Sequence, residues 1–491
     1  MQPLRYLCLL LLGFHFIPNG TAQPENLRLD LNEVIVLAQS DAPDVLLART
    51  RLTNSYWRFQ SFRADYRPQI DLTATLPDLN RSIEALTLPD GSDAFINRSL
   101  MTNTVGLSLT QDISATGGQV FAFTGLQRID LFSSSTTSYL ATPFVLGFSQ
   151  PIFGFNTLKW NKKIEPLRYE EATRTYAEEM EQVAGVASNL FFDLLNAQLT
   201  LEAAETDKAN ADTLFNISKG RYSVGKIAET DLLQVELGVM NADARLAAAQ
   251  LDQQTATEGL RNFLGITEAI IFDLVPPTEI PDFVVDADKA INYALQHRSE
   301  TIAFERRLRE ADRDVAEAKA AQGLNINLNG RFGLTQTANR FRDAYKRPLD
   351  QEQLSVGLEV PIADWGKATS RMEIARSNRE LEQMNVRQDR VNFEREILLK
   401  VQQFDLQRNQ VRLALRAYEV AQKRQDITRK RYLIGKIDLT DLNLALREQD
   451  EARRSYISAL QTFWLAYYEL RRLCLYDFAN DQPLFKRLEG Y

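Results

Sequence analysis

The side chains that could do chemistry in this chain of 491 residues are few, and two aspartates stand out among them. Of two cysteines and two histidines, Cys8 and His15 lie in an apolar N-terminal segment, which leaves Cys474 and His297. One cysteine and one histidine provide no internal disulfide, no metal cluster and no Cys-His nucleophile pair. Asp231 and Asp441 instead occupy the same place in two copies of one motif. Their spacing indicates a repeated structural or pore-lining carboxylate, and no enzyme signature is visible.

The motif is a stretch of twelve residues, 221–232, that recurs as 431–442 with eight identical positions. In each copy a glycine stands where a helix would stop, and Thr-Asp stands where the next helix would start. This is typical of the tip of a helical hairpin, with a left-handed C′ residue followed by a polar N-terminal cap. The repeat predicts an internally duplicated, elongated helical protein rather than a compact enzyme domain.

Composition limits the location and the partners. The net charge is −8, and removal of Arg5 with a leader makes it −9, so nucleic acid is a poor partner. Residues 1–22 have the three-part layout of a secretory signal peptide, with an apolar run from Leu7 to Ile17 and a small-residue cleavage site; the alternative is a buried N-terminal helix. No later segment approaches the ~18 apolar residues of a membrane-spanning helix. The protein is therefore expected to be exported, and any membrane crossing must use strands.

Hydrophobic periodicity divides the rest of the chain into two related halves. We expect a signal peptide at 1–22, a first helix-strand-strand-helix-helix repeat at 23–265, a linker at 266–286, a second repeat at 287–476 and a C-terminal tail at 477–491. The tips and the preceding strand ends match at an offset of 210 residues, whereas the earlier segments match at 256. The difference places 46 extra residues in the first half, in a strand and loop insert at about 77–143.

Helix lengths suggest the helical architecture. The helix after the strands in each half has about 65 residues, so it spans roughly 100 Å at ~1.5 Å per residue. The return helix of one half and the opening helix of the other have about 35 residues each. Stacked end to end, the two shorter helices match the long one. Each chain then offers four helical pillars, two continuous and two composite.

The strands alternate between apolar and polar residues, most clearly over residues 324–334. This alternation fits a membrane β-barrel with lipid outside and water inside, and it fits a soluble sandwich equally well. Aromatic residues favour the membrane, because aromatic side chains collect at membrane interfaces; they are Phe153, Phe155, Trp160 and Trp365 at the strand-helix junctions. Four core strands cannot close a barrel, so the chain must form an oligomer, and three copies would provide twelve strands and twelve pillars.

With the signal peptide, the duplicated halves and the paired Arg-Tyr-x-x-Gly-Lys-Ile-x-x-Thr-Asp-Leu tips, the chain resembles the TolC-like outer membrane efflux protein family. The resemblance covers nearly all of the mature chain. It implies a mixed α and β fold and a homotrimer, in which a 12-stranded outer-membrane β-barrel continues into a long periplasmic α-helical coiled-coil barrel. It also implies partners in a Gram-negative cell: outer-membrane lipid, a periplasmic adaptor (membrane fusion) protein and an inner-membrane RND-type or ABC-type transporter.

The tips are the candidate functional sites. The bend residues, small and apolar apart from one lysine in each tip, are expected to dock on the adaptor; these are Val224, Gly225, Lys226 and Ile227 in the first tip, and Ile434, Gly435, Lys436 and Ile437 in the second. The candidate gate consists of Asp231, Asp441, Tyr432, Thr230 and Thr440. The simpler interpretation of each aspartate is structural, because an acidic side chain is favoured at a helix N-terminus. The resemblance implies in addition that Asp231 is held by Tyr432. Ile437 and Leu444 replace an arginine and an aspartate of the family's gate.

Three functions follow from these observations. The first is a passive exit duct of a tripartite efflux or type I secretion system, without cofactors or bond chemistry. The second is a periplasmic coiled-coil scaffold without a channel. The third, a secreted enzyme, lacks a catalytic constellation.

Overall fold

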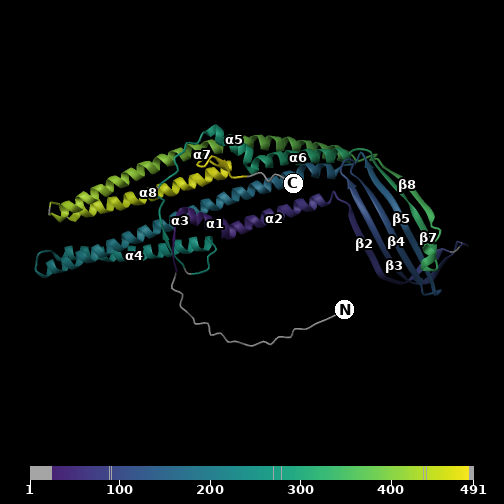
Figure 1. Cartoon of the computed structure of the whole chain (residues 1–491), viewed down its shortest axis with the longest axis horizontal. Helices are drawn as coiled ribbons and strands as arrows, with labels where there is room; N and C mark the ends of the chain where they lie inside the picture. Colours follow the sequence, from purple (N-terminus) through teal and green to yellow (C-terminus); the bar gives the residue numbers. More distant parts are fainter. Residues whose placement is uncertain are drawn as a thin grey trace, which may run out of the picture. The chain divides into compact units, whose positions relative to one another are not determined.

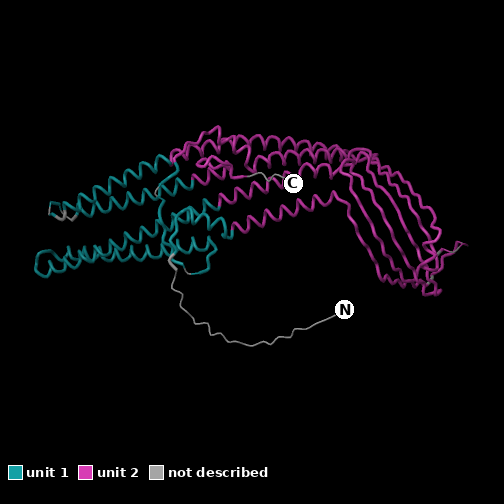
Figure 2. The backbone as a smooth tube through the Cα atoms, viewed as in Figure 1, with its two compact units in different colours: residues 1–43, 183–281, 408–465 teal, residues 44–182, 282–407, 466–491 magenta. Residues whose placement is uncertain are grey.

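A computed structural model of the chain describes residues 25–485, apart from positions 88, 90, 269, 278, 435 and 438. The expected leader at 1–22 and the last residues of the expected tail, 486–491, lie outside the described residues. The chain forms two compact units (Figure 2). Unit 1 comprises the described residues within 1–43, 183–281 and 408–465, and unit 2 those within 44–182, 282–407 and 466–491. Both repeats contribute to each unit, because each long helix runs through both.

Unit 1 contains two helical hairpins. The first joins α3 (Thr157–Ser223) to α4 (Glu229–Phe263), and the second joins α7 (Lys367–Leu433) to α8 (Leu439–Cys474) (Figure 1). Lys208 Nζ on α3 lies 3.1 Å from an Asp243 oxygen on α4. Arg424 on α7 is paired with Glu448 on α8. A lysine or arginine therefore ties the two arms of each hairpin together.

A small parallel sheet accompanies these hairpins in unit 1. Strand β1 (Glu25–Leu29) pairs with β6 (Ile270–Leu274), and α1 (Leu31–Asp41) follows directly after β1. The Asp30 carboxylate caps α1 by accepting the Glu33 N–H at 2.8 Å. The strand β6 lies in the segment 266–286. The sequence predicts only a linker there, because prolines dominate the pattern of this segment.

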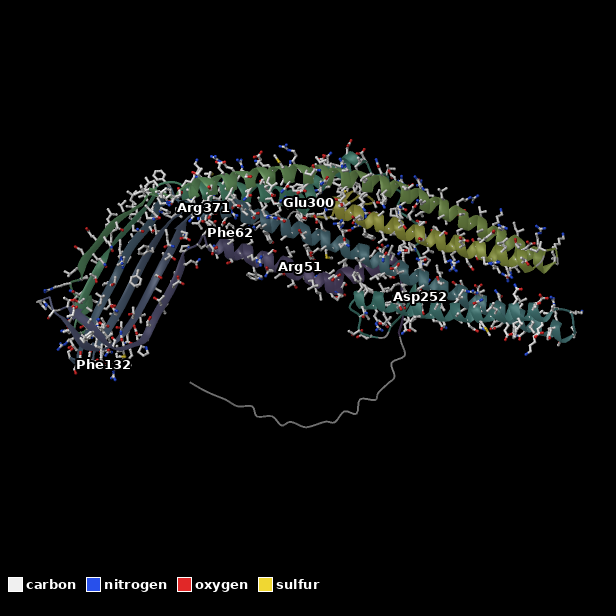
Figure 3. The ribbon with its side chains drawn as sticks, turned by 180° about the vertical axis from the view of Figure 1, so that it is seen from behind. Arg51, Phe62, Phe132, Asp252, Glu300 and Arg371 are labelled. Carbon is white, nitrogen blue, oxygen red and sulfur yellow. The ribbon has the colours of Figure 1, made fainter. Side chains whose placement is uncertain are left out.

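In unit 2 four helical columns lie side by side in the order α2, α3, α6, α7. Three contacts establish this order. Arg51 of α2 (Pro43–Ala64) is 2.8 Å from Glu179 of α3 (Figure 3). Glu171 of α3 is 2.5 Å from Arg306 of α6 (Ser299–Ala321). Arg307 of α6 is 2.8 Å from Asp389 of α7. The short helix α5 (Ala287–His297) precedes α6.

Unit 2 also contains an antiparallel sheet of six strands in the order β2-β3-β4-β5-β7-β8 (Figure 1). Their bounds are Gln69–Thr87, Asp93–Ile113, Gly118–Leu131, Thr136–Ile152, Asn325–Ala338 and Leu349–Glu359. A short 3-10 helix, η1 (Phe341–Tyr345), links β7 to β8. The four core strands expected from the sequence correspond to β2, β5, β7 and β8, and the insert, whose place the sequence left open, adds β3 and β4. The insert does not leave the sheet, since β3 and β4 are hydrogen-bonded between β2 and β5.

The two faces of this sheet differ in polarity. Strand register places an apolar set on one face, namely Leu72, Leu107, Ala122, Leu146 and Phe332. The opposite face carries a mostly polar set across the same strands, namely Asp71, Ser108, Ser149, Asn329 and Ser355. Because successive side chains of a strand alternate between faces, one register keeps both sets separate across the sheet.

A buried ionic cluster lies at the C-terminal end of α8 in unit 2. Arg471 lies 2.7 Å from Glu181 and 3.1 Å from Asp477, and all three side chains are largely buried. Burial raises the pKa of Glu181 even though Arg471 opposes the shift. Burial would also raise the pKa of Asp477, but hydrogen bonds from Asn480 and the charge of Arg471 hold it below its ordinary value.

We expect Arg471→Met to destabilise the protein by about 3–5 kcal/mol, because it leaves two buried carboxylates without their cation. The measurement is thermal unfolding followed by circular dichroism of the helices. The matched control is Arg376→Met, whose 2.7 Å pair with Glu373 is 61% exposed on both sides. An exposed pair contributes about 0–1 kcal/mol, so equal effects of the two variants would contradict a structural role for the cluster.

Candidate docking tips, gate and membrane band

The two hairpin tips close with the same backbone hydrogen bond. The Lys226 N–H donates to the Arg221 carbonyl at 2.8 Å, and the Lys436 N–H donates to the Arg431 carbonyl at 3.0 Å. This six-residue closure is the Schellman motif, which satisfies carbonyls at a helix C-terminus. Gly225 has φ +71°, a left-handed conformation that favours glycine. Its counterpart, Gly435, lies outside the described residues.

The tips carry exposed apolar side chains. Val224 is 67% exposed, and Ile434 is 65% exposed. Ile227 and Ile437 are half-buried beside them, and Lys226 and Lys436 are exposed. Apolar residues that close a hairpin need no exposure for that purpose, so this arrangement favours a surface that meets a partner.

Four of the five candidate gate residues lie in the first turn of the return helices, and Tyr432 belongs to the last turn of α7. Thr230 and Asp231 are the second and third residues of α4, and Thr440 and Asp441 are those of α8. The Asp231 carboxylate accepts the Ala228 N–H at 3.3 Å, which is a helix-capping interaction. The Tyr432 side chain lies outside what the structure describes, so its pairing with Asp231 stays a prediction.

The four candidate interface aromatics lie at the two strand-helix junctions. Phe153 is 70% exposed between β5 and α3, and Trp365 is 99% exposed between β8 and α7. Both have positive φ, 66° and 55° respectively. Phe155 is half-buried, and Lys163 Nζ lies 4.7 Å from the centre of the half-buried Trp160 ring.

The apolar face of the sheet contains residues that the sequence analysis did not single out. On the two outermost strands the exposed members are Ile70 and Leu72 on β2, and Leu354, Val356 and Leu358 on β8. Alternation alone could have found them, since each is separated from the next by one residue of the other face. They form an apolar band that continues across the sheet.

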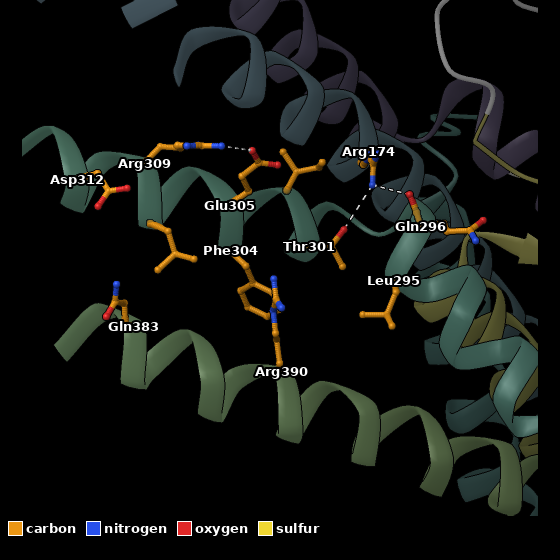
Figure 4. A pocket seen from close by; sticks show the side chains of 12 residues that line it. Arg174, Leu295, Gln296, Thr301, Phe304, Glu305, Arg309, Asp312, Gln383 and Arg390 are labelled. Atoms are coloured by element: carbon orange, nitrogen blue, oxygen red, sulfur yellow. Dashed lines mark hydrogen bonds and ion pairs between the residues drawn. The ribbon is translucent and has the colours of Figure 1, made fainter. Parts of the chain in front are cut away.

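Unit 2 has a groove of about 650 Å³ between helices, lined by Arg174, Arg309 and Asp312 among others (Figure 4). Arg174 donates to the Gln296 carbonyl at 2.8 Å, Arg309 is 3.4 Å from Glu305, and Asp312 is 2.7 Å from Arg379. Each of these charged side chains therefore already has a polar partner in the protein. Within the described ranges no group of three His, Cys, Asp or Glu side chains could hold a metal ion.

A family model described as outer membrane efflux protein matches residues 34–266 and 290–474. The chain belongs to the outer membrane efflux protein family. The family consists of outer membrane efflux channels, which are passive conduits and not enzymes. The chain is accordingly an outer membrane channel of a Gram-negative cell with a periplasmic helical part. None of the helices that the structure describes is both long and apolar enough to cross a membrane.

Known relatives agree with this family. Outer membrane protein TolC of Vibrio cholerae serotype O1 is 23% identical over 310 residues, which are 62% of this chain and 69% of that protein. The CmeC outer membrane channel of Campylobacter jejuni has a similar fold, with a TM-score of 0.65, 15% identity and coverage of 93% of this chain and 87% of that one. The MtrE outer membrane channel of Neisseria gonorrhoeae, solved in its open state, has a TM-score of 0.59, 13% identity and coverage of 92% and 90%.

Proposed function

We propose that the chain is the homotrimeric exit duct of a tripartite efflux or type I secretion assembly. In this proposal substrates pass through a water-filled lumen from a periplasmic adaptor and an inner-membrane RND-type or ABC-type transporter to the outside. The chain itself makes and breaks no bonds. The observation that carries the proposal is a set of exposed apolar seams, together with the two outer edges of the sheet, that a neighbouring copy would cover.

The first seam lies in unit 1 on the outer sides of the hairpins. Exposed apolar residues recur on α4 at helical spacing, namely Leu233, Leu237, Met240 and Leu251. On α7 they recur every seven residues, namely Leu413, Val420 and Ile427. An apolar stripe with this period packs against another helix in a coiled coil. The α4 stripe of one copy and the α7 stripe of the next are complementary in length and character.

A second seam lies in unit 2, where α2 and α7 are the outer columns of the four. The exposed apolar residues are Leu46 and Trp57 on α2, and Ile374, Leu381, Val391, Leu399 and Leu406 on α7. The outer strands of the sheet, β2 and β8, each have a partner on one side only in the described strand order. These are different surfaces at opposite sides of the same layers. A head-to-tail contact between different surfaces closes a ring when its rotation permits, and three copies satisfy the family's trimer.

The scaffold alternative predicts different behaviour. A duct must be extracted from the outer membrane with detergent and should migrate as a heat-modifiable trimer, whereas a periplasmic scaffold needs no detergent. The test is membrane fractionation followed by electrophoresis of unheated and heated samples. Release of the protein by osmotic shock without detergent would refute the duct.

We also propose that Asp231 and Asp441 form the gate of this duct. In a trimer they would place six carboxylates near the tips, and such a ring favours cations over anions in a narrow pore. The six carboxylates repel one another, and the proposed hydrogen bond between Asp231 and Tyr432 would stabilise the closed arrangement against this repulsion. The docking of Val224 and Ile434 on the adaptor belongs to the same proposal.

We expect Asp231→Ala combined with Tyr432→Phe to raise single-channel conductance severalfold, because the closed arrangement loses its latch. Planar-bilayer recordings beside the wild type provide the measurement. The control is Glu229→Ala, which removes an exposed acid of the same helical turn outside the proposed latch. Unchanged conductance in the double variant would reduce Asp231 to the helix cap that its bond to the Ala228 N–H describes.

A further inference from the structure

The inserted hairpin of β3 and β4 lies within the wall of the sheet and is built into the strand-helix junctions. At the turn between β3 and β4, the Asn156 side chain donates to the Ser114 carbonyl at 3.0 Å and accepts the Lys159 N–H at 2.9 Å at the start of α3. Gln150 of β5 donates to the Thr116 carbonyl at 3.1 Å. The same side chains therefore fix the turn, β5 and the first turn of α3.

The other side of the hairpin is anchored as well. The Gln111 side chain of β3 donates to the Tyr66 carbonyl at 3.1 Å, and the Tyr66 hydroxyl donates to the Leu158 carbonyl at 2.7 Å. Gln111 thus ties β3 to the connection between α2 and β2. A peripheral loop needs no such anchors, so β3 and β4 are integral strands of the wall.

Two phenylalanines of β4 lie on the polar face without projecting far from it. A Cβ atom on Gly125 would lie 2.6 Å from Phe123 Cζ, and one on Gly106 would lie 2.8 Å from Phe123 Cε2. Phe121 covers Gly147 of β5 in the same way. Each ring lies against the backbone of glycines that have no side chain to hold it away. The inserted strands consequently add width to the sheet and keep the polar face open.

From this geometry we propose that three copies close an 18-stranded barrel whose outer pore admits hydrated cargo of the size of a small folded polypeptide. This inference rests on the trimeric duct proposed above and deepens it. Strand β8 of each copy pairs with β2 of the next; β2 leads away from the helices and β8 leads back to them, so the new pairing is antiparallel like the others. Both strands alternate, and the apolar set continues around the outside.

Barrel geometry gives the expected width. With strands about 4.8 Å apart and tilted by about 40°, eighteen strands close at a backbone diameter of about 36 Å, and twelve strands at about 24 Å. The four helical columns of unit 2 give twelve in a trimer, and helices about 9 Å apart close a ring about 35 Å across at their axes. A barrel with six strands per copy is therefore about as wide as a ring with four helical columns per copy, so the lumen does not narrow between the two. Side chains of about 5 Å on each wall leave a free bore of about 26 Å, against about 14 Å for twelve strands.

The lining is suited to bulky hydrated cargo. Its members are largely uncharged and hydrophilic, among them Ser108, Ser149, Asn329 and Ser355. Ser108 is paired with Phe123, and a separate row of paired strand positions joins Gln119, Ser149, Asn329 and Ser355. Such a wall exerts little electrostatic selection, and eighteen-stranded barrels leave an aqueous channel. Size exclusion then becomes the property that separates the wide barrel from a narrow one.

The test is labelling of introduced cysteines in intact cells by maleimide polymers of graded diameter. Ser355→Cys and Val356→Cys are adjacent exposed positions of β8 on opposite faces of the sheet. Burial raises the pKa of the native Cys474 thiol to about 12, so it remains unreactive. We expect a polymer about 20 Å across to label Ser355→Cys and not Val356→Cys, because the second faces lipid.

Two deletions sharpen this test. Removal of residues 81–99 shortens the β2–β3 ribbon to the level at which Asn80 pairs with Leu100, which excludes the ribbon as an obstruction at the mouth. Removal of residues 81–135 deletes β3 and β4, and an Asn-Gly turn then joins Asn80 to Thr136. The two ends can be joined because they lie at the same height in the sheet: Leu100 pairs with Leu131, and Leu131 pairs with Thr136. We expect the first deletion to admit the 20 Å polymer and the second to exclude it.

The wide barrel is overturned if a small maleimide labels Ser355→Cys but the polymer of about 20 Å does not. This result must hold in both the full-length protein and the variant without residues 81–99. The trimeric duct survives such a result. A protein that is not a trimer in the outer membrane fraction overturns both proposals together. The comparison between the full-length protein and the variant without residues 81–99 remains valid even if the variant without residues 81–135 fails to fold.

Discussion

Replacement of Val224 and Ile434 together by aspartate is expected to abolish export. Both side chains are exposed at the bends of the two tips, and neither supports the packing of its own hairpin. Burial of a valine or isoleucine side chain contributes about 1.5–3 kcal/mol, and an unpaired carboxylate buried in its place adds a desolvation cost, so the double variant should lose adaptor binding at least a hundredfold. The measurement is adaptor affinity of the purified trimer, together with efflux in cells.

The control for this variant is Val284→Asp, an exposed valine outside the tips. It should leave export intact. The double variant should still be a heat-modifiable trimer in the outer membrane, because its substitutions lie in the turns and away from the seams. Normal export with both aspartates in place would remove the docking proposal and leave the tips as helix terminations.

The second large effect is expected from the seam on α7. Leu413→Glu with Val420→Glu places two carboxylates in the stripe proposed to face α4 of the next copy, and ring symmetry repeats the change three times. Burial of a leucine or valine stabilises by about 1.5–3 kcal/mol, so the trimer loses several kcal/mol at each interface. We expect monomers or aggregates in native mass spectrometry of the detergent-extracted protein.

Gln422→Glu provides the matched control, because it adds a carboxylate at an exposed position of α7 that is two residues beyond Val420 and therefore on roughly the opposite side of the helix from the stripe. It should assemble normally. A stable trimer with glutamate at both 413 and 420 would mean that the seam faces solvent or another partner, and the ring contact would have to be sought elsewhere.

The helical part of the fold was largely predictable from the sequence. The repeated glycine and Thr-Asp positions place both tips, and the structure ends α3 at Ser223 and α7 at Leu433, just before them. Helix ends depend on local backbone chemistry, which a motif records directly. The segment 266–286 was less informative, because β6 pairs with the distant β1 and short-range periodicity contains no signal for such pairing.

The width of the sheet was not predictable in the same way. Alternation identified strands in the insert, but a hairpin can lie in the plane of a sheet or fold away from it with the same pattern. The anchors that decide this, such as Asn156 to Ser114, connect residues 42 positions apart. The side-chain relation of Asp231 to Tyr432 is likewise a matter of long-range packing, and it remains a prediction.

The central claim is that the trimer alone is a passive conduit, and planar-bilayer recording of the purified protein tests it most directly. With salt on both sides, and without nucleotide, adaptor or transporter, we expect discrete current steps whose size is proportional to voltage. The same steps should become larger in the Asp231→Ala, Tyr432→Phe variant. Inserted trimers that carry no current in either protein would contradict the claim.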